Sequence, residues 1–394
     1  MEPSVKARIY SLDLLRGLVM IIMALDHVRD FFHVDAFTSD PLDVTTTTVP
    51  LYFTRWITHF CAPVFVFLAG TSVYLQGLRK DKNELSMFLF QRGLWLIFVE
   101  LVIITFSWTL DITFPVFVMQ VIWAIGICMV FMGFVIQLPY AAIMFLGIAI
   151  VAGHNILDYV PSTHKGFFWD LTRNGNFSVY ELVEGHRFVI IYPFIPWLGV
   201  MMLGYCIGKI YDPAFAPVER KKVLIRLGIG LLLLFAIIRS FNAYGNPFQW
   251  SKQESVLYTF LSFMNVHKYP PSLLYLCATL GPALLFLAVF ENSNNKITKV
   301  ISVFGRVPLF YYVLHFYFIR FLCMFFFIAR GHSITERTPD LFGLMPFKFV
   351  IAGEGVSLGW VYVIWILLVM ALYPLCVWFN KYKMSRTNWW LSYL

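Results

Sequence analysis

The sequence predicts an all-α polytopic membrane protein, a bundle of about ten transmembrane helices that forms a single domain over residues 1–394. Three observations lead to this prediction. The chain is 59% hydrophobic, 19% aromatic and only 13% charged, a composition that excludes a soluble domain of this length. Apolar stretches of about 20 residues, long enough to cross a bilayer as a helix, recur along the chain. Neither a soluble domain nor a low-complexity tract interrupts them.

Ten stretches are expected to form the transmembrane helices. In chain order they lie near residues 10–33, 50–78, 86–108, 114–136, 139–158, 188–210, 223–241, 271–291, 305–329 and 357–380. Three long connections, near 159–187, 242–270 and 330–356, fall on the side opposite the amino terminus and are rich in Gly, Asn, Pro and aromatic residues. Such loops are expected to be ordered caps over a cavity rather than flexible linkers.

Lysine and arginine predict the orientation, because cytoplasmic loops carry an excess of both. With the amino terminus in the cytoplasm, seventeen of these residues fall on the cytoplasmic side and seven on the other. The seventeen lie in clusters at 6–8, 79–92, 209–226, 296–306 and 381–386. Both termini are therefore expected in the cytoplasm. The formal net charge of +8 reflects this bias and does not indicate a nucleic-acid partner.

The first expected span contains ionisable residues within or at the edge of its apolar stretch: Asp13, Arg16, Asp26 and His27. Charges in hydrocarbon are costly and usually mark function. Arg16 and His27 are eleven residues apart, so both lie on one helix face, about 16 Å apart along the axis. His27 titrates near neutral pH and is the candidate general base, which the neighbouring Asp26 carboxylate would orient. His33, six residues further on, is a second candidate.

Two segments elsewhere in the chain supply outer-side candidates. His59 is four residues after Arg55 and shares its helix face. It could orient a substrate or a base, or it could be an interfacial residue. The run 267–271 (HKYPP) directly precedes a span and could form the rim of an outer pocket.

Three residues are candidates on the cytoplasmic side or near the midplane. Glu100 is an isolated carboxylate in the third span, and such a group needs a partner or a proton. Arg16 is its natural partner, as a structural ion pair or as catalytic support. Arg306 is expected at the cytoplasmic end of the ninth span, where Pro308 suits a first helical turn. His315 follows about 13 Å deeper, either as a functional group or as a hydrogen-bond partner of a tyrosine.

The remaining motifs leave two main classes of function. The six cysteines occur singly in apolar spans, without metal-ligand spacing, and no nucleotide, phosphate-loop or nucleophile-elbow motif is present. No metal cofactor is expected. A membrane enzyme that uses histidine chemistry fits these residues, and so does a proton-coupled secondary transporter or flippase. The chain shows no convincing pair of inverted halves, which weighs against the transporter, and buried charges of this cost weigh against a non-catalytic scaffold.

Four segments resemble the heparan-alpha-glucosaminide N-acetyltransferase catalytic family. They are residues 11–17 (SLDLLRG) followed by Asp26 and His27, 65–70 (FVFLAG), 192–199 (YPFIPWLG) and 305–312 (GRVPLFYY). In this order, they are spread over most of the chain. An arginine that is followed by a histidine, with ten residues between the two, also resembles a pattern of the wider transmembrane acyltransferase superfamily. That superfamily includes bacterial sugar O-acetyltransferases.

The resemblance implies a helical bundle with a central cavity open to both sides. It also implies transfer of an acetyl group from cytosolic acetyl-CoA to a sugar amine or hydroxyl across the membrane. His27 falls on the superfamily's catalytic position and Arg16 on its paired basic residue. His33 approximately matches the histidine on which the lysosomal animal enzyme relies.

The resemblance also bears on location and partners. The chain lacks the extra N-terminal luminal domain of the animal enzymes, which implies a bacterial relative in the inner membrane whose acceptor need not be heparan. The expected partners are acetyl-CoA, a sugar or glycan acceptor and the lipid bilayer, and homo-oligomerisation is left open.

A mechanism follows as a hypothesis. Arg92, Arg306 and Arg16 would hold the phosphates of acetyl-CoA at the cytoplasmic mouth. His27, oriented by Asp26, would deprotonate the acceptor, and Arg16 or His315 would stabilise the oxyanion. Direct transfer and a transient acetyl-histidine both remain open.

Overall fold

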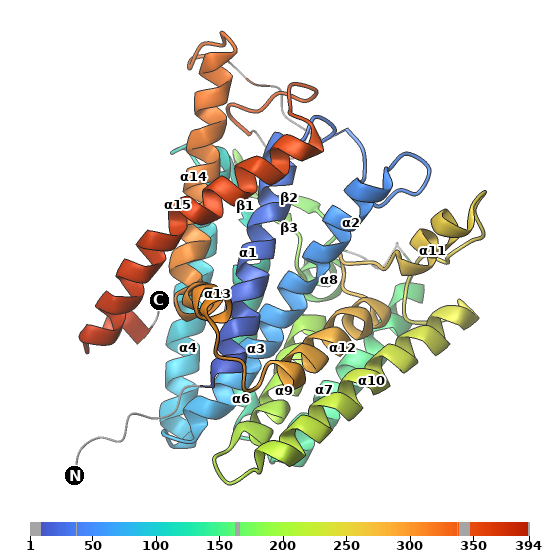
Figure 1. Ribbon diagram of the computed structural model, residues 1–394, viewed down its shortest axis with the longest axis vertical. Coiled ribbons are helices and arrows are strands. Elements are labelled where there is room, and N and C mark those ends of the chain that lie inside the picture. The colour runs from blue at the N-terminus through green and yellow to red at the C-terminus, as the bar shows by residue number, and fades with distance from the viewer. Residues whose placement is uncertain (1–8, 37, 162–165, 337, 339–346, 393–394) are drawn as a thin grey trace.

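The computed structural model describes residues 9–36, 38–161, 166–336, 338 and 347–392. The protein is 69% helical. Helix α1 (Tyr10–Phe32) runs through the middle of the helical bundle (Figure 1) and packs against α2, α3, α12, α13, α14 and α15. A helix with six Asp, His and Arg residues is therefore enclosed by other helices.

The other helices follow in chain order. They are α2 (Val49–Ile57), α3 (Cys61–Gly77), α4 (Lys82–Phe98), α5 (Thr105–Thr109), α6 (Val121–Val135), α7 (Tyr140–Gly153), α8 (Phe167–Trp169), α9 (Phe194–Gly208), α10 (Pro217–Phe241), α11 (Val256–Met264), α12 (Leu273–Val289), α13 (Lys296–Arg306), α14 (Pro308–Ala329) and α15 (Leu358–Ser385). Short η1 (Thr58–Phe60) joins α2 to α3, and a π-helical turn, η2 (Val99–Ile104), joins α4 to α5.

Helix starts follow from local capping. The Asp81 side chain accepts hydrogen bonds from two backbone N–H groups at the start of α4, and Asn295 and Thr298 form a capping box at the start of α13. Each supplies acceptors for donors that the first turn leaves unpaired. Pro308 occupies the first position of α14, as expected from its fixed φ.

Seven helical segments of the described chain are long and apolar enough to cross a membrane. They are Val49–Gly77, Lys82–Thr109, Tyr140–Tyr159, Phe194–Tyr211, Pro217–Phe241, Pro308–Ala329 and Leu358–Ser385. Helices α6 and α12 are apolar but have only 15 and 17 residues, and α1 carries several charged residues. A helical membrane protein is thus confirmed, whereas the expected count of about ten spans is not.

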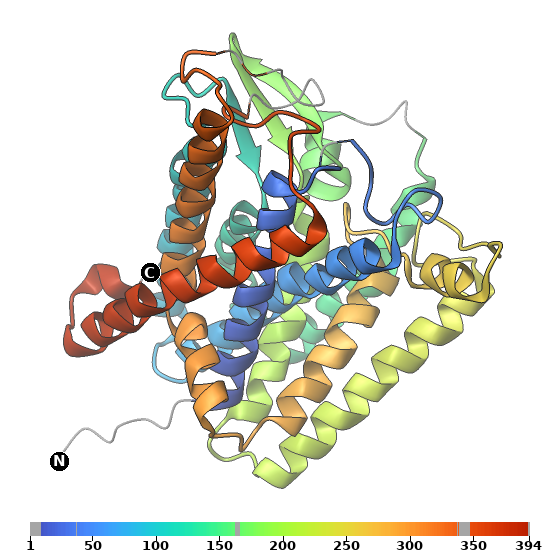
Figure 2. The same cartoon turned by 45° about the horizontal axis from the view of Figure 1, so that its top comes forward.

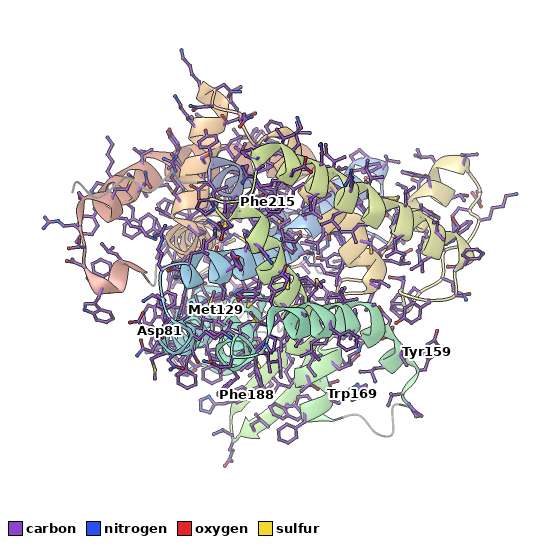
Figure 3. The ribbon with its side chains drawn as sticks, turned by 90° about the horizontal axis from the view of Figure 1, so that it is seen from below. Asp81, Met129, Tyr159, Trp169, Phe188 and Phe215 are labelled. Carbon is purple, nitrogen blue, oxygen red and sulfur yellow. The ribbon has the colours of Figure 1, made fainter. Side chains whose placement is uncertain are left out.

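A small sheet lies beyond one end of the bundle (Figure 2). Its strands are β1 (Val116–Met119), β2 (Ser178–Val183) and β3 (His186–Ile190), in the order β1-β3-β2. β1 pairs with β3 in parallel, with Val116 opposite Arg187, and β2 pairs with β3 antiparallel. Seen from below, Phe188 of β3 and Trp169 of α8 lie at one margin of the molecule, away from Phe215 in the turn before α10 (Figure 3).

The sheet changes two of the expected elements. Residues 114–136 are not one helical span, because β1 precedes α6, and residues 188–190 belong to β3 rather than to α9. Short apolar runs rich in valine and phenylalanine suit a buried strand as well as a helix, and hydropathy does not separate the two. Strand β2 lies within the 159–187 connection, so that part of the loop is ordered as expected.

The crossing of α1 and α13 depends on two glycines. A Cβ atom on Gly17 would lie 2.0 Å from the Ile301 carbonyl oxygen, and one on Gly305 would lie 1.9 Å from the Asp13 carbonyl oxygen. Both distances are far inside van der Waals contact, and in each case the obstacle is backbone. The two helices therefore approach as closely as they do only because these positions lack side chains.

Gly305→Ala is expected to destabilise the protein because α13 must move away from α1. Overpacking costs about 1–3 kcal/mol, and more where backbone must shift. Thermal unfolding in detergent should show a lower midpoint for this variant. The matched control is Gly230→Ala on α10, where an added Cβ meets nothing within 4 Å and alanine favours the helix. Equal midpoints for the two variants would contradict this account of the crossing.

Candidate functional site

Two cavities lie along α1. The first, of about 310 Å³, is lined by residues that include Asp26, His27, Arg55, Lys268 and Tyr269, and we call it the His27 cavity. The second, of about 280 Å³, is lined by residues that include Arg16, Arg92, Arg306, Tyr312 and Lys383, and we call it the Arg16 cavity. Phe65 of α3 lines both cavities. One helix therefore presents an arginine to one cavity and a histidine to the other.

The Arg16 cavity is cationic. Of its described lining residues, Arg16, Arg92, Arg306 and Lys383 are basic and none is acidic. Sequence reasoning named the three arginines but treated Lys383 only as a marker of orientation. The sequence offered little reason to place Lys383 in a cavity, because this lysine reaches the cavity only through the packing of α15. The arrangement suits a ligand with several negative charges.

Arg16 is held at this cavity by three helices. Its Nη1 atom donates to the Gly305 carbonyl at 3.2 Å and lies 3.4 Å from Asp13 Oδ1, and its Nη2 atom donates to Ser72 Oγ at 3.3 Å. Asp13 Oδ2 also lies 3.6 Å from Arg306 Nε. One carboxylate therefore contacts two of the cavity's arginines and fixes them beside each other.

The expected ion pair between Arg16 and Glu100 is wrong. Glu100 Oε2 accepts hydrogen bonds from the backbone N–H groups of Ile122 and Trp123, at 3.0 and 3.2 Å. These groups belong to the first turn of α6, which carries unpaired donors and a partial positive charge. The sequence could not indicate this partner, because α6 begins only after the unexpected strand β1.

His27 is surrounded by aromatic rings. Its ring centroid lies 4.4 Å from that of Phe316, 5.3 Å from that of His315 and 6.1 Å from that of Trp108. Its buried Nδ1 atom has no hydrogen-bond partner among the described residues. Trp108 also lines the His27 cavity, and sequence reasoning did not single it out.

Asp26 is the centre of an ion cluster. Arg55 Nη1 donates to both carboxylate oxygens at 2.8 Å, and Thr58 Oγ1 donates at 2.9 Å. Arg29 Nη2 lies 2.7 Å away, and Lys268 Nζ 3.8 Å away. We expected Asp26 to orient His27, but in the described residues no hydrogen bond joins these two side chains. The carboxylate instead pairs with the three cations, because a buried cation needs a negatively charged partner.

The other histidines named from the sequence lie in different settings. His33 caps the end of α1, lines the His27 cavity, and accepts a hydrogen bond at Nδ1 from the Asp35 N–H at 3.2 Å. His59 lies in η1, 3.2 Å from the Arg55 carbonyl and against the Tyr275 ring. It is buried and is not among the lining residues of either cavity, so the geometry favours a packing role for it.

His315 is fully buried beside His27. Its Nδ1 atom lies 3.2 Å from the Tyr311 carbonyl oxygen, which can only accept, so Nδ1 carries the proton. The Nε2 atom is then an acceptor and not a donor. This tautomer does not suit the expected oxyanion-stabilising role of His315. The alternative expectation, a hydrogen bond to a tyrosine, is met by the backbone carbonyl of Tyr311.

Residues from later in the chain complete the His27 cavity. Lys268 and Tyr269 enter it from the run 267–271, which the sequence suggested as a pocket rim. Gln120, between β1 and α6, and Tyr192, just after β3, also line it. Both positions depend on the sheet; Tyr192 begins one of the segments that resemble the family, whereas Gln120 had no signal in the sequence. The cavity thus combines ionised, amide and aromatic groups around a single helix end.

A comparison with known families finds one match for this chain. The model of the family described as heparan-alpha-glucosaminide N-acetyltransferase, catalytic, matches residues 8–236, more than half of the chain. The matched segment contains Arg16, His27 and Arg92, whereas Lys268, Arg306 and His315 lie beyond it. No curated protein matches the chain. The chain belongs to the heparan-alpha-glucosaminide N-acetyltransferase catalytic family, a family of membrane acetyltransferases.

Proposed function

We propose that this protein transfers an acetyl group from acetyl-CoA in the Arg16 cavity to a sugar amine or hydroxyl in the His27 cavity. The observation that carries the proposal is the placement of α1, which brings Arg16 into one cavity and His27 into the other while Phe65 lines both. A donor and an acceptor entering from opposite ends would meet near Phe65.

The cationic lining of the Arg16 cavity supports acetyl-CoA as its ligand. The phosphates of CoA are multiply charged, and arginine and lysine bind phosphate through charge-assisted hydrogen bonds. The cavity lies toward the amino-terminal end of α1, where Arg16 is located. Basic residues mark the cytoplasmic side, so we assign this cavity to the cytoplasm, where acetyl-CoA is available.

The lining of the His27 cavity supports a sugar as acceptor. Trp108, Tyr192 and Tyr269 offer aromatic surface with polar edges. Asp30 and Asp35 add carboxylates that attract a protonated amine. We place this cavity, which lies toward the sheet and the long connections, on the outer side of the membrane.

His27 is the proposed base. It would take the acceptor's proton as the amine or hydroxyl attacks the thioester carbonyl. Arg16 is eleven residues away on the same helix, about 16 Å along the axis, so we assign it to the donor's phosphates rather than to the oxyanion. Direct transfer and an acetylated His27 are distinguished by the mass of protein quenched after exposure to acetyl-CoA alone.

The test is CoA release by the purified protein in lipid nanodiscs. Acetyl-CoA is supplied with and without glucosamine, and free thiol is measured over time. Release that depends on glucosamine, together with acetylated glucosamine in equal amount, is the expected result. Failure of the protein to bind or cleave acetyl-CoA would overturn the proposal and favour a proton-coupled transporter, which should ignore CoA thioesters.

Lys383→Gln is expected to raise the KM for acetyl-CoA about tenfold with little change in kcat. A hydrogen bond to a charged group contributes about 1.5–3 kcal/mol, and a lost phosphate contact weakens ground and transition states alike. The matched control is Lys222→Gln on α10, where the lysine is exposed and pairs with Glu219. An unchanged KM in the Lys383 variant would remove Lys383 from the donor site.

A further inference from the structure

Three buried polar atoms belong to side chains that follow one another in space from one cavity to the other. His27 Nδ1, His315 Nε2 and the Tyr312 hydroxyl each lack a hydrogen-bond partner within the part of the chain that the structure describes. Unsatisfied buried polar groups are uncommon in folded proteins, and each requires an explanation. The His315 ring contacts both the His27 ring and the Tyr312 ring, which points to a shared function.

The three side chains connect one cavity to the other. His27 lines the His27 cavity, and Tyr312 lines the Arg16 cavity. His315 lies between them with no exposed surface, its ring centroid 5.3 Å from that of His27 and 5.5 Å from that of Tyr312. Rings at these separations can bring their edge atoms within hydrogen-bond reach by small rotations. Tyr312 and His315 are one helical turn apart on α14, so their relation is fixed by the helix.

The tautomer of His315 gives this chain of groups a direction. Because Nδ1 is held by the Tyr311 carbonyl, Nε2 is free to accept a proton. His27, once protonated by an acceptor, has a proton to give from its buried Nδ1. The pair therefore consists of a donor that faces an acceptor, and not of two competing donors.

The proposed reaction also requires a proton to move from the His27 cavity to the Arg16 cavity. Acetyl transfer breaks an N–H or O–H bond of the acceptor and the C–S bond of the thioester, and it forms a new bond from acetyl carbon to nitrogen or oxygen. The C–S electron pair leaves on the sulfur, which needs a proton to become the free thiol. With the acceptor in one cavity and CoA in the other, the proton is released on one side of the partition and consumed on the other.

We propose that His27, His315 and Tyr312 form a relay that carries the acceptor's proton to the departing CoA thiolate. The inference rests on the proposed acetyl transfer. His27 takes the proton from the acceptor and passes one from Nδ1 to Nε2 of His315. Tyr312 gives its hydroxyl proton to the thiolate and is reprotonated from Nε2 of His315. His315 and Tyr312 thus end as they began, whereas His27 ends with its proton on Nε2 instead of Nδ1 and returns to the starting tautomer by exchanging protons with the cavity before the next turnover. His27 and Tyr312 act on reacting atoms, and His315 acts through them.

Tyr312→Phe tests the relay, and Tyr311→Phe is its matched control. Both tyrosines are buried, both hydroxyls lack a partner among the described residues, and both rings contact His315. Only Tyr312 lines a cavity. Removing an unsatisfied hydroxyl should leave thermal stability unchanged or raised, so both variants are expected to fold.

The expected result is a fall of about 100-fold in kcat for Tyr312→Phe, with the KM for acetyl-CoA within twofold of the parent. The solvent deuterium isotope effect on kcat should rise, because proton delivery to sulfur becomes limiting. Tyr311→Phe should match the parent in all three measures. His315→Gln, which removes the proton carrier between the other two, should reproduce the Tyr312→Phe pattern.

The failures of the two proposals are distinguishable. If the parent protein shows no glucosamine-dependent CoA release, the acetyltransferase proposal itself fails. If the parent is active and Tyr312→Phe behaves as Tyr311→Phe does, the relay alone is overturned. A fall in kcat without a change in isotope effect, or with lost acetyl-CoA binding, would also overturn it in favour of a structural role.

Discussion

Replacing His27 with asparagine is expected to lower the kcat for acetyl transfer by about 10²–10⁴-fold while acetyl-CoA still binds. Proton transfer by a positioned side chain contributes a factor of this size, and asparagine cannot accept the acceptor's proton. The donor's phosphates would contact the Arg16 cavity, at the other end of α1, so their affinity should be retained. The measurements are glucosamine-dependent CoA release and acetyl-CoA binding in nanodiscs.

Two further histidine variants complete this experiment. His332→Gln changes a histidine that contacts Glu336 and Glu354 outside both cavities, and it should keep the parent's rate. His33→Asn changes the other histidine of the His27 cavity. Activity that survives in the His27 variant but disappears in the His33 variant would identify His33 as the base instead.

Replacing Asp26 with alanine is expected to destabilise the protein by about 3–5 kcal/mol. Asp26 contacts Arg55, Arg29 and Lys268, and all three cations are largely buried. Removing the carboxylate leaves these charges without their common partner in a site that is shielded from water. Thermal or denaturant unfolding in detergent should show the loss, and the variant should express poorly.

The control for this prediction is Asp35→Asn. Asp35 lines the same cavity, but its side chain is 56% exposed, and exposed substitutions usually change stability by less than about 0.5 kcal/mol. A double variant with Asp26→Ala and Arg55→Met should recover part of the lost stability, because it removes one of the orphaned cations. No difference between the two aspartate variants would show that the cluster is not what stabilises this end of α1.

The sequence predicted the parts of the site that lie on one helix. The relative positions of Arg16 and His27 along α1 follow from the rise and twist of a helix, and in the structure each of them lines a different cavity. The basic residues Arg92 and Arg306 were likewise readable, because charges at the ends of apolar segments are few. Helical periodicity and the rarity of charged residues in apolar segments are local properties, so both can be recognised in a single sequence.

The partners of those residues could not be predicted. Glu100 bonds to the start of α6 rather than to Arg16, and Asp26 bonds to Arg55 and Thr58 rather than to His27. In each case the competing partner comes from a segment that is distant in sequence or whose boundary was misjudged. A buried carboxylate pairs with whichever donors the fold brings to it, and sequence distance contains no information about that choice.

By itself, the sequence therefore determined a helical membrane protein and its family resemblance, and it predicted the helix that carries Arg16 and His27. The tertiary structure alone decided that Arg16 and His27 line different cavities, that Lys268 and Lys383 enter them, and that a strand precedes α6. It also decided that the His315 ring contacts both His27 and Tyr312. The physical reason is that hydropathy and helical period act within one segment, whereas cavities and buried contacts arise where α1, α3, α14 and the sheet meet.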